Sequence, residues 1–144
     1  MNAARAFSLV EMMMVLVIVA VLAGIAWPSY AAYVQRGRVL EAVARLSEAR
    51  ARMEQYFLDW RSYVDASGAC GVPPPPPGPG DAFTLACSAT ASTYTYSAAG
   101  TSGGSMEAFA YAIDETGTRT TAALPAAWSK HADCWTIRPD GYCL

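Results

Sequence analysis

The four cysteines are the residues of this sequence with the most evident chemistry. They lie at positions 70, 87, 134 and 143, behind an apolar segment that targets the chain to a membrane. No two of them have the spacing of two to four residues that is typical of structural zinc sites, and the single histidine is His131. An even number of cysteines beyond such a segment favours disulfides over free thiols. Of the three pairings we favour Cys70–Cys87 and Cys134–Cys143, because each closes a short loop.

Glu11 is the second residue that could do chemistry. It is the only charge between positions 7 and 26, and an ionised carboxylate in hydrocarbon costs several kcal/mol, so such residues usually have a function. A structural explanation is also open. The first turn of a helix favours a negative side chain, which would leave Glu11 harmlessly at the headgroup interface.

A small group of cations near aromatic residues could bind nucleic acid. From Arg61 onward the chain has four basic and seven acidic residues, which disfavours strong nonspecific binding to phosphate backbones but permits a local patch. The alternative is that the aromatic rings are sheet core or loop anchors. The candidate DNA contacts are Arg119, Lys130 and Arg138, which lie near Trp128, Trp135 and Tyr142 in the sequence.

The sequence shows no catalytic constellation. No serine has a plausible base beside it, and the Gly-rich stretch at residues 100–105 lacks the lysine and the following helix of a phosphate-binding loop. Asp133 and Asp140 are too sparse for a calcium site. We therefore expect a protein that is not an enzyme and has no metal or other cofactor.

The apolar segment predicts a membrane-inserted helix. Residues 12–27 carry no charge, and a helix of about 20 residues spans about 30 Å, the thickness of a bilayer core. A helix also satisfies its own backbone hydrogen bonds there. An ordinary secretory signal is the alternative, but the polar leader is short and a helical pattern, not a cleavage motif, follows Pro28.

The helical pattern continues beyond the membrane segment. We expect one helix from Phe7 to about Leu58, with a kink where Pro28 lacks an N–H and Gly24 weakens the preceding turn. Its second half, residues 30–58, is amphipathic. The predicted buried face comprises Val39, Val43, Leu46, Met53, Phe57 and Trp60.

The rest of the chain predicts an α+β domain. Residues 61–80 form a loop, in which the five prolines at 73–77 favour a stiff polyproline II connector. Residues 81–144 show the short alternating segments of a small antiparallel sheet packed on the helix. The expected strands are 83–87, 94–98, 108–113 and 119–122, with a further short strand at 135–137.

The N-terminus resembles that of type IV prepilins. The resemblance is carried by Ala6-Phe7-Ser8-Leu9-Val10-Glu11, the apolar run and Trp27-Pro28-Ser29-Tyr30. It implies a leader at residues 1–6, a transmembrane and filament-core helix at 7–29 and an extracytoplasmic domain at 30–144. It also implies that prepilin peptidase cuts between Ala6 and Phe7 and methylates the amine of Phe7. Ala6 departs from the family's usual glycine, so we expect slower processing.

The same resemblance gives Glu11 a role. In a filament built from these helices, the Phe7 amine of a neighbouring subunit would pair with the Glu11 carboxylate and set the axial register. The implied partners are other pilin subunits, prepilin peptidase and an inner-membrane assembly platform. The implied location is the inner membrane of a Gram-negative bacterium and then the surface pilus.

The C-terminal half is similar to minor pilins of the PilE-like group. The similarity rests on Phe109 to Asp114, Trp128, Cys134-Trp135 and Cys143, and it implies a disulfide-bounded loop between Cys134 and Cys143. The expected function is that of a structural subunit, major or minor, of a type IV pilus for adhesion, twitching motility or DNA uptake. A type II secretion pseudopilin and a DNA-binding minor pilin are the alternatives.

Overall fold

A computed structural model describes residues 8–131 and 133–144, apart from the side chain of Pro28. Its first element is a single helix, α1 (Leu9–Trp60), which ends two residues later than the predicted Leu58. The chain divides into two compact units, residues 1–34 and 35–144. The second unit is here called the headpiece.

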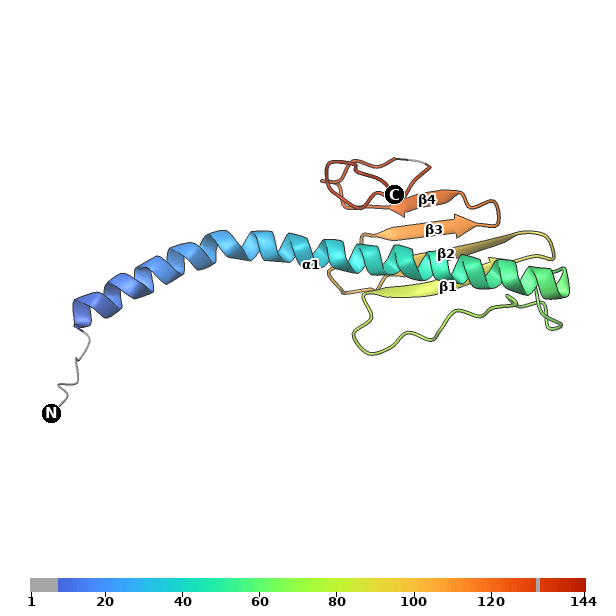
Figure 1. Cartoon of the computed structure of the whole chain (residues 1–144), viewed down its shortest axis with the longest axis horizontal. Coiled ribbons are helices and arrows are strands. Elements are labelled where there is room, and N and C mark those ends of the chain that lie inside the picture. The colour runs from blue at the N-terminus through green and yellow to red at the C-terminus, as the bar shows by residue number, and fades with distance from the viewer. Residues whose placement is uncertain (1–7, 132) are drawn as a thin grey trace. The chain divides into compact units, whose positions relative to one another are not determined.

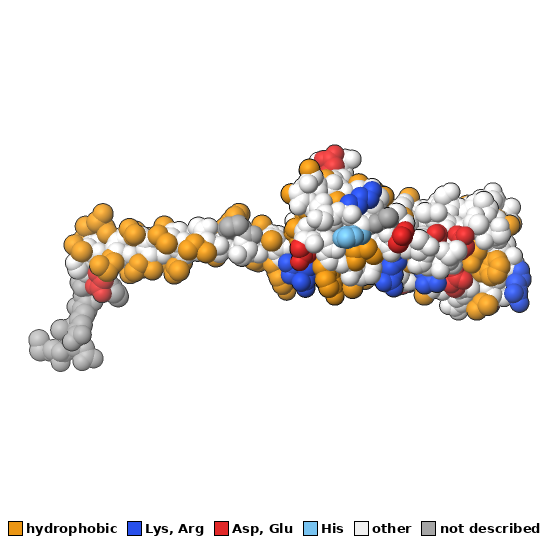
Figure 2. Space-filling model, turned by 90° about the horizontal axis from the view of Figure 1, so that it is seen from above, with side chains coloured by type: hydrophobic (Ala, Val, Ile, Leu, Met, Phe, Trp, Pro, Cys, Tyr) orange, Lys and Arg blue, Asp and Glu red, His pale blue; other side chains and the backbone are white. Residues whose placement is uncertain are grey.

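Most apolar side chains that the structure describes in the N-terminal unit are exposed. Every described side chain from Ser8 to Tyr33 is exposed, and most of those before Trp27 are large and apolar (Figure 2). Within the described residues, α1 is the one helix long and apolar enough to cross a membrane. Gly24 and Pro28 both lie inside α1, and the kink that we expect there stays a prediction.

The headpiece contains a four-stranded antiparallel sheet in the order β1-β2-β3-β4, with α1 lying along one face of it (Figure 1). The four predicted strands are confirmed, with small changes at their ends. The third begins at Ala110 rather than at 108, because residues 106–109 form a turn in which the Phe109 N–H donates to the Met106 carbonyl at 2.9 Å. The strands are β1 (Phe83–Ala89), β2 (Tyr94–Gly100), β3 (Ala110–Asp114) and β4 (Arg119–Ala123).

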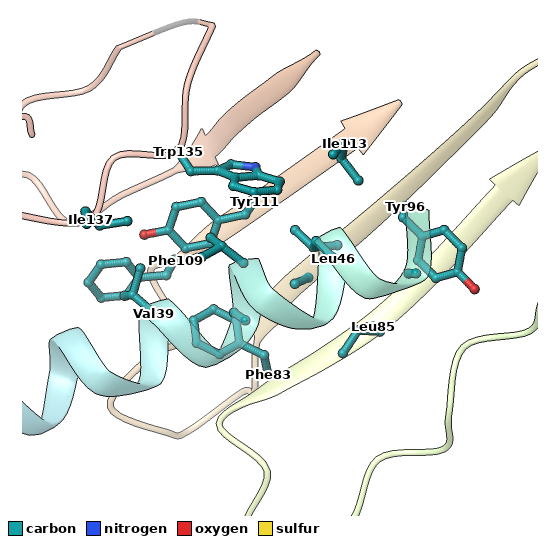
Figure 3. Close-up of a cluster of buried hydrophobic side chains, with 14 of the residues drawn as sticks. Val39, Leu46, Phe83, Leu85, Tyr96, Phe109, Tyr111, Ile113, Trp135 and Ile137 are labelled. Carbon is teal, nitrogen blue, oxygen red and sulfur yellow. The ribbon is translucent and has the colours of Figure 1, made fainter. Parts of the chain in front are cut away.

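The core lies between the inner face of the sheet and one face of α1 (Figure 3). Strand register places Leu85, Ala98, Tyr111 and Thr121 in one row across the sheet, and all four are buried. Helical residues three or four positions apart pack against this face, which is the pattern predicted from the sequence. The buried residues of α1 are Val39, Ala42, Val43, Leu46, Ala49 and Met53.

Trp60 is a correction to the predicted core. Its side chain is 69% exposed, although it follows the spacing of the buried face. The chain reverses at Arg61, and Tyr63 closes the end of the core in place of Trp60. The Tyr63 ring lies 4.5 Å from that of Phe57 and 4.7 Å from that of Tyr94.

The proline-rich connector is attached to the headpiece at both ends. Before the prolines, a disulfide joins Cys70 to Cys87 in β1, and the Tyr96 hydroxyl donates to the Val72 carbonyl. After them, the Asp81 carboxylate accepts the Gly78 N–H at 2.9 Å and lies 3.5 Å from the Arg45 guanidinium. The Gly78 N–H and Arg45 lower the pKa of Asp81, because both favour its ionised form.

The C-terminal segment packs beside β4 without adding a strand to the sheet. The strand predicted at 135–137 is a single bridge, Thr136 to Cys143, inside the loop that the Cys134–Cys143 disulfide closes. The buried Thr121 hydroxyl of β4 donates to the Cys134 carbonyl at 2.6 Å and accepts the Thr136 N–H at 2.9 Å. Because these bonds use backbone groups that an added strand would need, the segment stays irregular.

The disulfide between Cys70 and Cys87 should contribute strongly to stability. Its sequence separation of 17 residues corresponds to about 3 kcal/mol in the chain-entropy model. We expect the double variant Cys70→Ser, Cys87→Ser of the headpiece to lose about that much free energy of unfolding in a denaturant titration. The unchanged Cys134–Cys143 disulfide provides an internal control, and an unaltered denaturation midpoint would contradict the prediction.

Candidate functional site

Glu11 lies in the first turn of α1, where its carboxylate is exposed among apolar neighbours. Within the described residues it has no ion-pair partner. Ala6 and Phe7, at which we expect cleavage and methylation, lie outside the described residues. The large apolar neighbours of Glu11 along the helix are exposed as well.

The three predicted DNA contacts all lie at the surface of the headpiece, and we call Arg119, Lys130 and Arg138 the basic patch. Arg119 is the first residue of β4, and its guanidinium carbon lies 5.1 Å from the centre of the Trp135 ring. Trp135 is itself held in place, since it is buried and its indole N–H donates to the Ala112 carbonyl at 2.9 Å. The arginine therefore extends over a rigid aromatic support.

Lys130 and Arg138 come from two parts of the C-terminal segment that the structure joins. The N–H of Ser129 donates to the Pro139 carbonyl at 3.1 Å, which brings the two stretches together. The Lys130 ammonium donates to the Ala122 carbonyl of β4 at 2.9 Å. The Arg138 guanidinium carbon lies 4.8 Å from the centre of the Tyr142 ring.

Within the described residues, no carboxylate neutralises the three cations of the basic patch. The ion pairs within the described residues are Arg45–Glu41, Arg45–Asp81 and Arg52–Glu48, and none of them uses a cation of the patch. Figure 2 shows Lys and Arg side chains on the face that carries the single histidine, with some acidic side chains between them. Because each cation of the patch is exposed and has donors left over, an anion can reach it.

The three aromatic residues near the patch differ in how far they are buried. Trp135 is part of the core, and Trp128 is half-buried with its ring edge-on to Phe109 at 4.9 Å. Tyr142 is 52% exposed. Two of the three rings are therefore core or loop anchors, which was the alternative to a binding surface, and the third faces solvent.

Two features of the headpiece were not expected from the sequence. His131 packs its ring against Gly141, whose φ of 85° is a conformation that favours glycine in this turn of the C-terminal loop. The exposed end of α1 around Trp60 has the spacing of core residues and lies outside the core. The position of Trp60 outside the core has no local signal, because it depends on where the chain reverses. No group of three His, Cys, Asp or Glu side chains in the described part of the chain could hold a metal ion.

Two family models match this sequence. Residues 1–27 match the prokaryotic N-terminal methylation motif. Residues 28–109 match the family described as type IV minor pilin ComP, DNA uptake sequence receptor. The second match covers more than half of the chain and ends before the basic patch.

Among curated proteins, the chain is similar to two kinds of pilin. It is 32% identical over 72 residues to the type IV major pilin protein PilE1 of Neisseria gonorrhoeae, which covers 49% of this chain and 44% of the relative. It is 34% identical over 67 residues to a fimbrial protein of Pseudomonas aeruginosa, which covers 46% of this chain and 44% of the relative. The chain thus spans less than half the length of the curated relatives that it matches.

The methylation motif, the apolar first half of α1 and a headpiece of helix, antiparallel sheet and C-terminal disulfide loop agree with these matches. The family is one of membrane-anchored precursors that assemble with other pilins into surface filaments, and nothing in the described residues points to catalysis. The chain therefore belongs to the type IV pilins, in the family of the minor pilin ComP.

Proposed function

We propose that this pilin is a minor subunit of a type IV pilus and that its headpiece binds DNA at the filament surface. The observation that carries the proposal is the basic patch, whose three exposed cations lack carboxylate partners in the described part of the chain. The family model adds support, since its description names a receptor for DNA uptake sequences. Adhesion and twitching motility are other uses of such a filament, and no residue of the headpiece favours them specifically.

The patch suits phosphate groups more than base edges. Arginine and lysine neutralise phosphates and release counterions, a contribution that is independent of sequence and falls with salt. Tyr142, exposed beside Arg138, adds a ring that can contact a sugar or a base. With three cations and an overall charge of -2, we infer weak binding that many subunits in one filament would strengthen.

We further propose that the N-terminus is processed as in other type IV pilins. Prepilin peptidase would cut after Ala6 and methylate Phe7 while α1 spans the inner membrane of a Gram-negative cell, and an assembly platform would then move the helix into the filament. The exposed apolar side chains from Leu9 to Trp27 support this route, because they suit lipid and neighbouring helices equally well.

A type II secretion pseudopilin is the alternative with the same N-terminal motif. The disulfide loop from Cys134 to Cys143 supports the pilus, since the major pseudopilins have a calcium-binding loop at this place. The relatives named as a major pilin and a fimbrial protein support a pilus subunit as well.

The DNA proposal predicts a salt-dependent interaction that depends on the patch. We expect the headpiece to shift a short DNA duplex in a gel, with affinity that falls as salt rises. In the triple variant Arg119→Gln, Lys130→Gln, Arg138→Gln the slope of log affinity against log salt should decrease by about 2.7, or 0.9 for each phosphate that is no longer neutralised. Gel shifts and fluorescence anisotropy at several salt concentrations measure this.

A charge-matched variant provides the control. Arg36→Gln, Arg38→Gln, Arg52→Gln removes three positive charges from α1 and leaves the patch intact. It should retain most of the affinity and of the salt slope. If both triple variants lose affinity equally, the net charge of the headpiece is responsible and the assignment of the patch is wrong.

The assembly proposal predicts a defect confined to filament entry. In Glu11→Ala the Phe7 amine of a neighbouring subunit would be buried without its partner, which commonly costs about 3–5 kcal/mol. We expect the variant to reach the membrane fraction at the normal level and to be absent from sheared filaments analysed by mass spectrometry. Glu41→Ala, which removes an exposed headpiece carboxylate, should enter normally. Wild-type incorporation of Glu11→Ala would end this hypothesis.

A further inference from the structure

The last turn of α1 presents aromatic and apolar side chains to solvent. Leu58 and Trp60 are each 69% exposed, although the headpiece has a closed core. The Trp60 ring stacks with that of Tyr56, one turn earlier, with centroids 6.2 Å apart and planes at 29°. Tyr56 is in turn held against Gly71, where a Cβ atom would lie 2.1 Å from its ring. The exposed indole therefore rests on a fixed ring.

Arg61, beside this aromatic pair, has an unusual backbone conformation. Its φ is 54°, and no other residue except glycine has a positive φ among those that the structure describes. Its N–H donates to the Phe57 carbonyl at 2.8 Å and so ends the helix. Helices usually have glycine at this position, because a side chain there is strained. An arginine kept in a strained conformation suggests that its side chain is used.

The Arg61 side chain is exposed and makes no hydrogen bond or ion pair with the residues described. An exposed indole followed in the sequence by an exposed arginine offers the two kinds of group with which proteins bind single-stranded nucleic acid. The indole stacks on the base, and the cation contacts the phosphate. The charge of Arg61 complements a phosphate.

We propose that Tyr56, Trp60 and Arg61, here called the helix tip, form a stacking site for an unpaired nucleobase and its phosphate. The site deepens the proposed DNA-binding function and rests on it. It shares no residue with the basic patch, so the two can be tested separately. The patch holds phosphates of any DNA, whereas the tip selects strands with unpaired bases, such as single strands and frayed ends.

A second copy of this chain is the competing occupant of the tip. A contact between copies would bury Leu58 and Trp60 equally well. Such a contact would gain nothing specific from the Arg61 guanidinium. A nucleotide would gain a contact between that guanidinium and its phosphate. The observation that favours the nucleotide is therefore Arg61 and not the apolar area.

The test uses the headpiece, residues 35–144, which contains the whole core cluster from Val39 to Ile137 and both disulfides. The probe is a short labelled oligothymidylate, followed by fluorescence anisotropy. Quenching of tryptophan emission gives a second readout, because Trp27 is absent from the headpiece, Trp135 is buried and Trp128 is half-buried. We expect quenching on binding and a loss of affinity of about 10-fold or more in Trp60→Ala.

Two further variants separate binding from stability. Trp60→Phe should retain most of the affinity, since its ring still stacks. Arg61→Gly removes the strained side chain, so it should unfold at the same or a higher temperature while its affinity for the oligothymidylate decreases about 3-fold. A purely structural role for Arg61 predicts no change in affinity. Leu40→Ala, at a 40% exposed apolar residue elsewhere on α1, is the matched control and should bind normally.

Three results would overturn the proposal. The first is unchanged oligothymidylate affinity in Trp60→Ala. The second is self-association of the headpiece that Trp60→Ala abolishes, which would assign the tip to a second copy. The third is equal loss of duplex and single-strand binding in Trp60→Ala. Failure of duplex binding by the unmodified headpiece concerns the basic patch, and oligothymidylate binding would still test the tip.

Discussion

The contact between one face of α1 and the inner face of the sheet holds the headpiece together. Val39, Leu46 and Met53 are completely buried there, in one cluster with tyrosines from β2 and β3. The burial raises the pKa of Tyr111, whose hydroxyl donates to the Thr136 carbonyl at 2.9 Å. The same packing that fills the core therefore also anchors the C-terminal segment, and the basic patch depends on it.

The two units of the chain meet different physical demands. The headpiece buries its own apolar side chains in a closed core, and two disulfides compensate for its small size. The helix before residue 35 does the opposite, because its apolar side chains are exposed and must be covered by lipid or by other helices. The apolar side chains of this helix are covered only in a membrane or in a filament, which are the two environments of a pilin.

The surface cations are arranged by side chains that are themselves buried or bonded. Thr121 and Trp135 fix the C-terminal segment beside β4, and this leaves Arg119 and Arg138 lying over aromatic rings in place of carboxylates. On α1, by contrast, Arg45 and Arg52 are neutralised by acids four residues before them. The position of a cation in the fold, more than the overall charge, decides whether it can meet a phosphate.

The sequence by itself determined the helix, the four strands and the family, because periodicity and the N-terminal motif are local signals. It favoured both cysteine pairs by short loop closure, and the structure decided them. It also singled out Glu11 and the basic patch as candidates. Only the tertiary structure decided that Trp60, which has the spacing of a core residue, lies outside the core. It also decided that residues 135–137 form no strand of the sheet. In both cases a distant element decides burial and hydrogen bonding. Tyr63 closes the core after the chain reverses, and Thr121 takes the backbone bonds of the C-terminal segment.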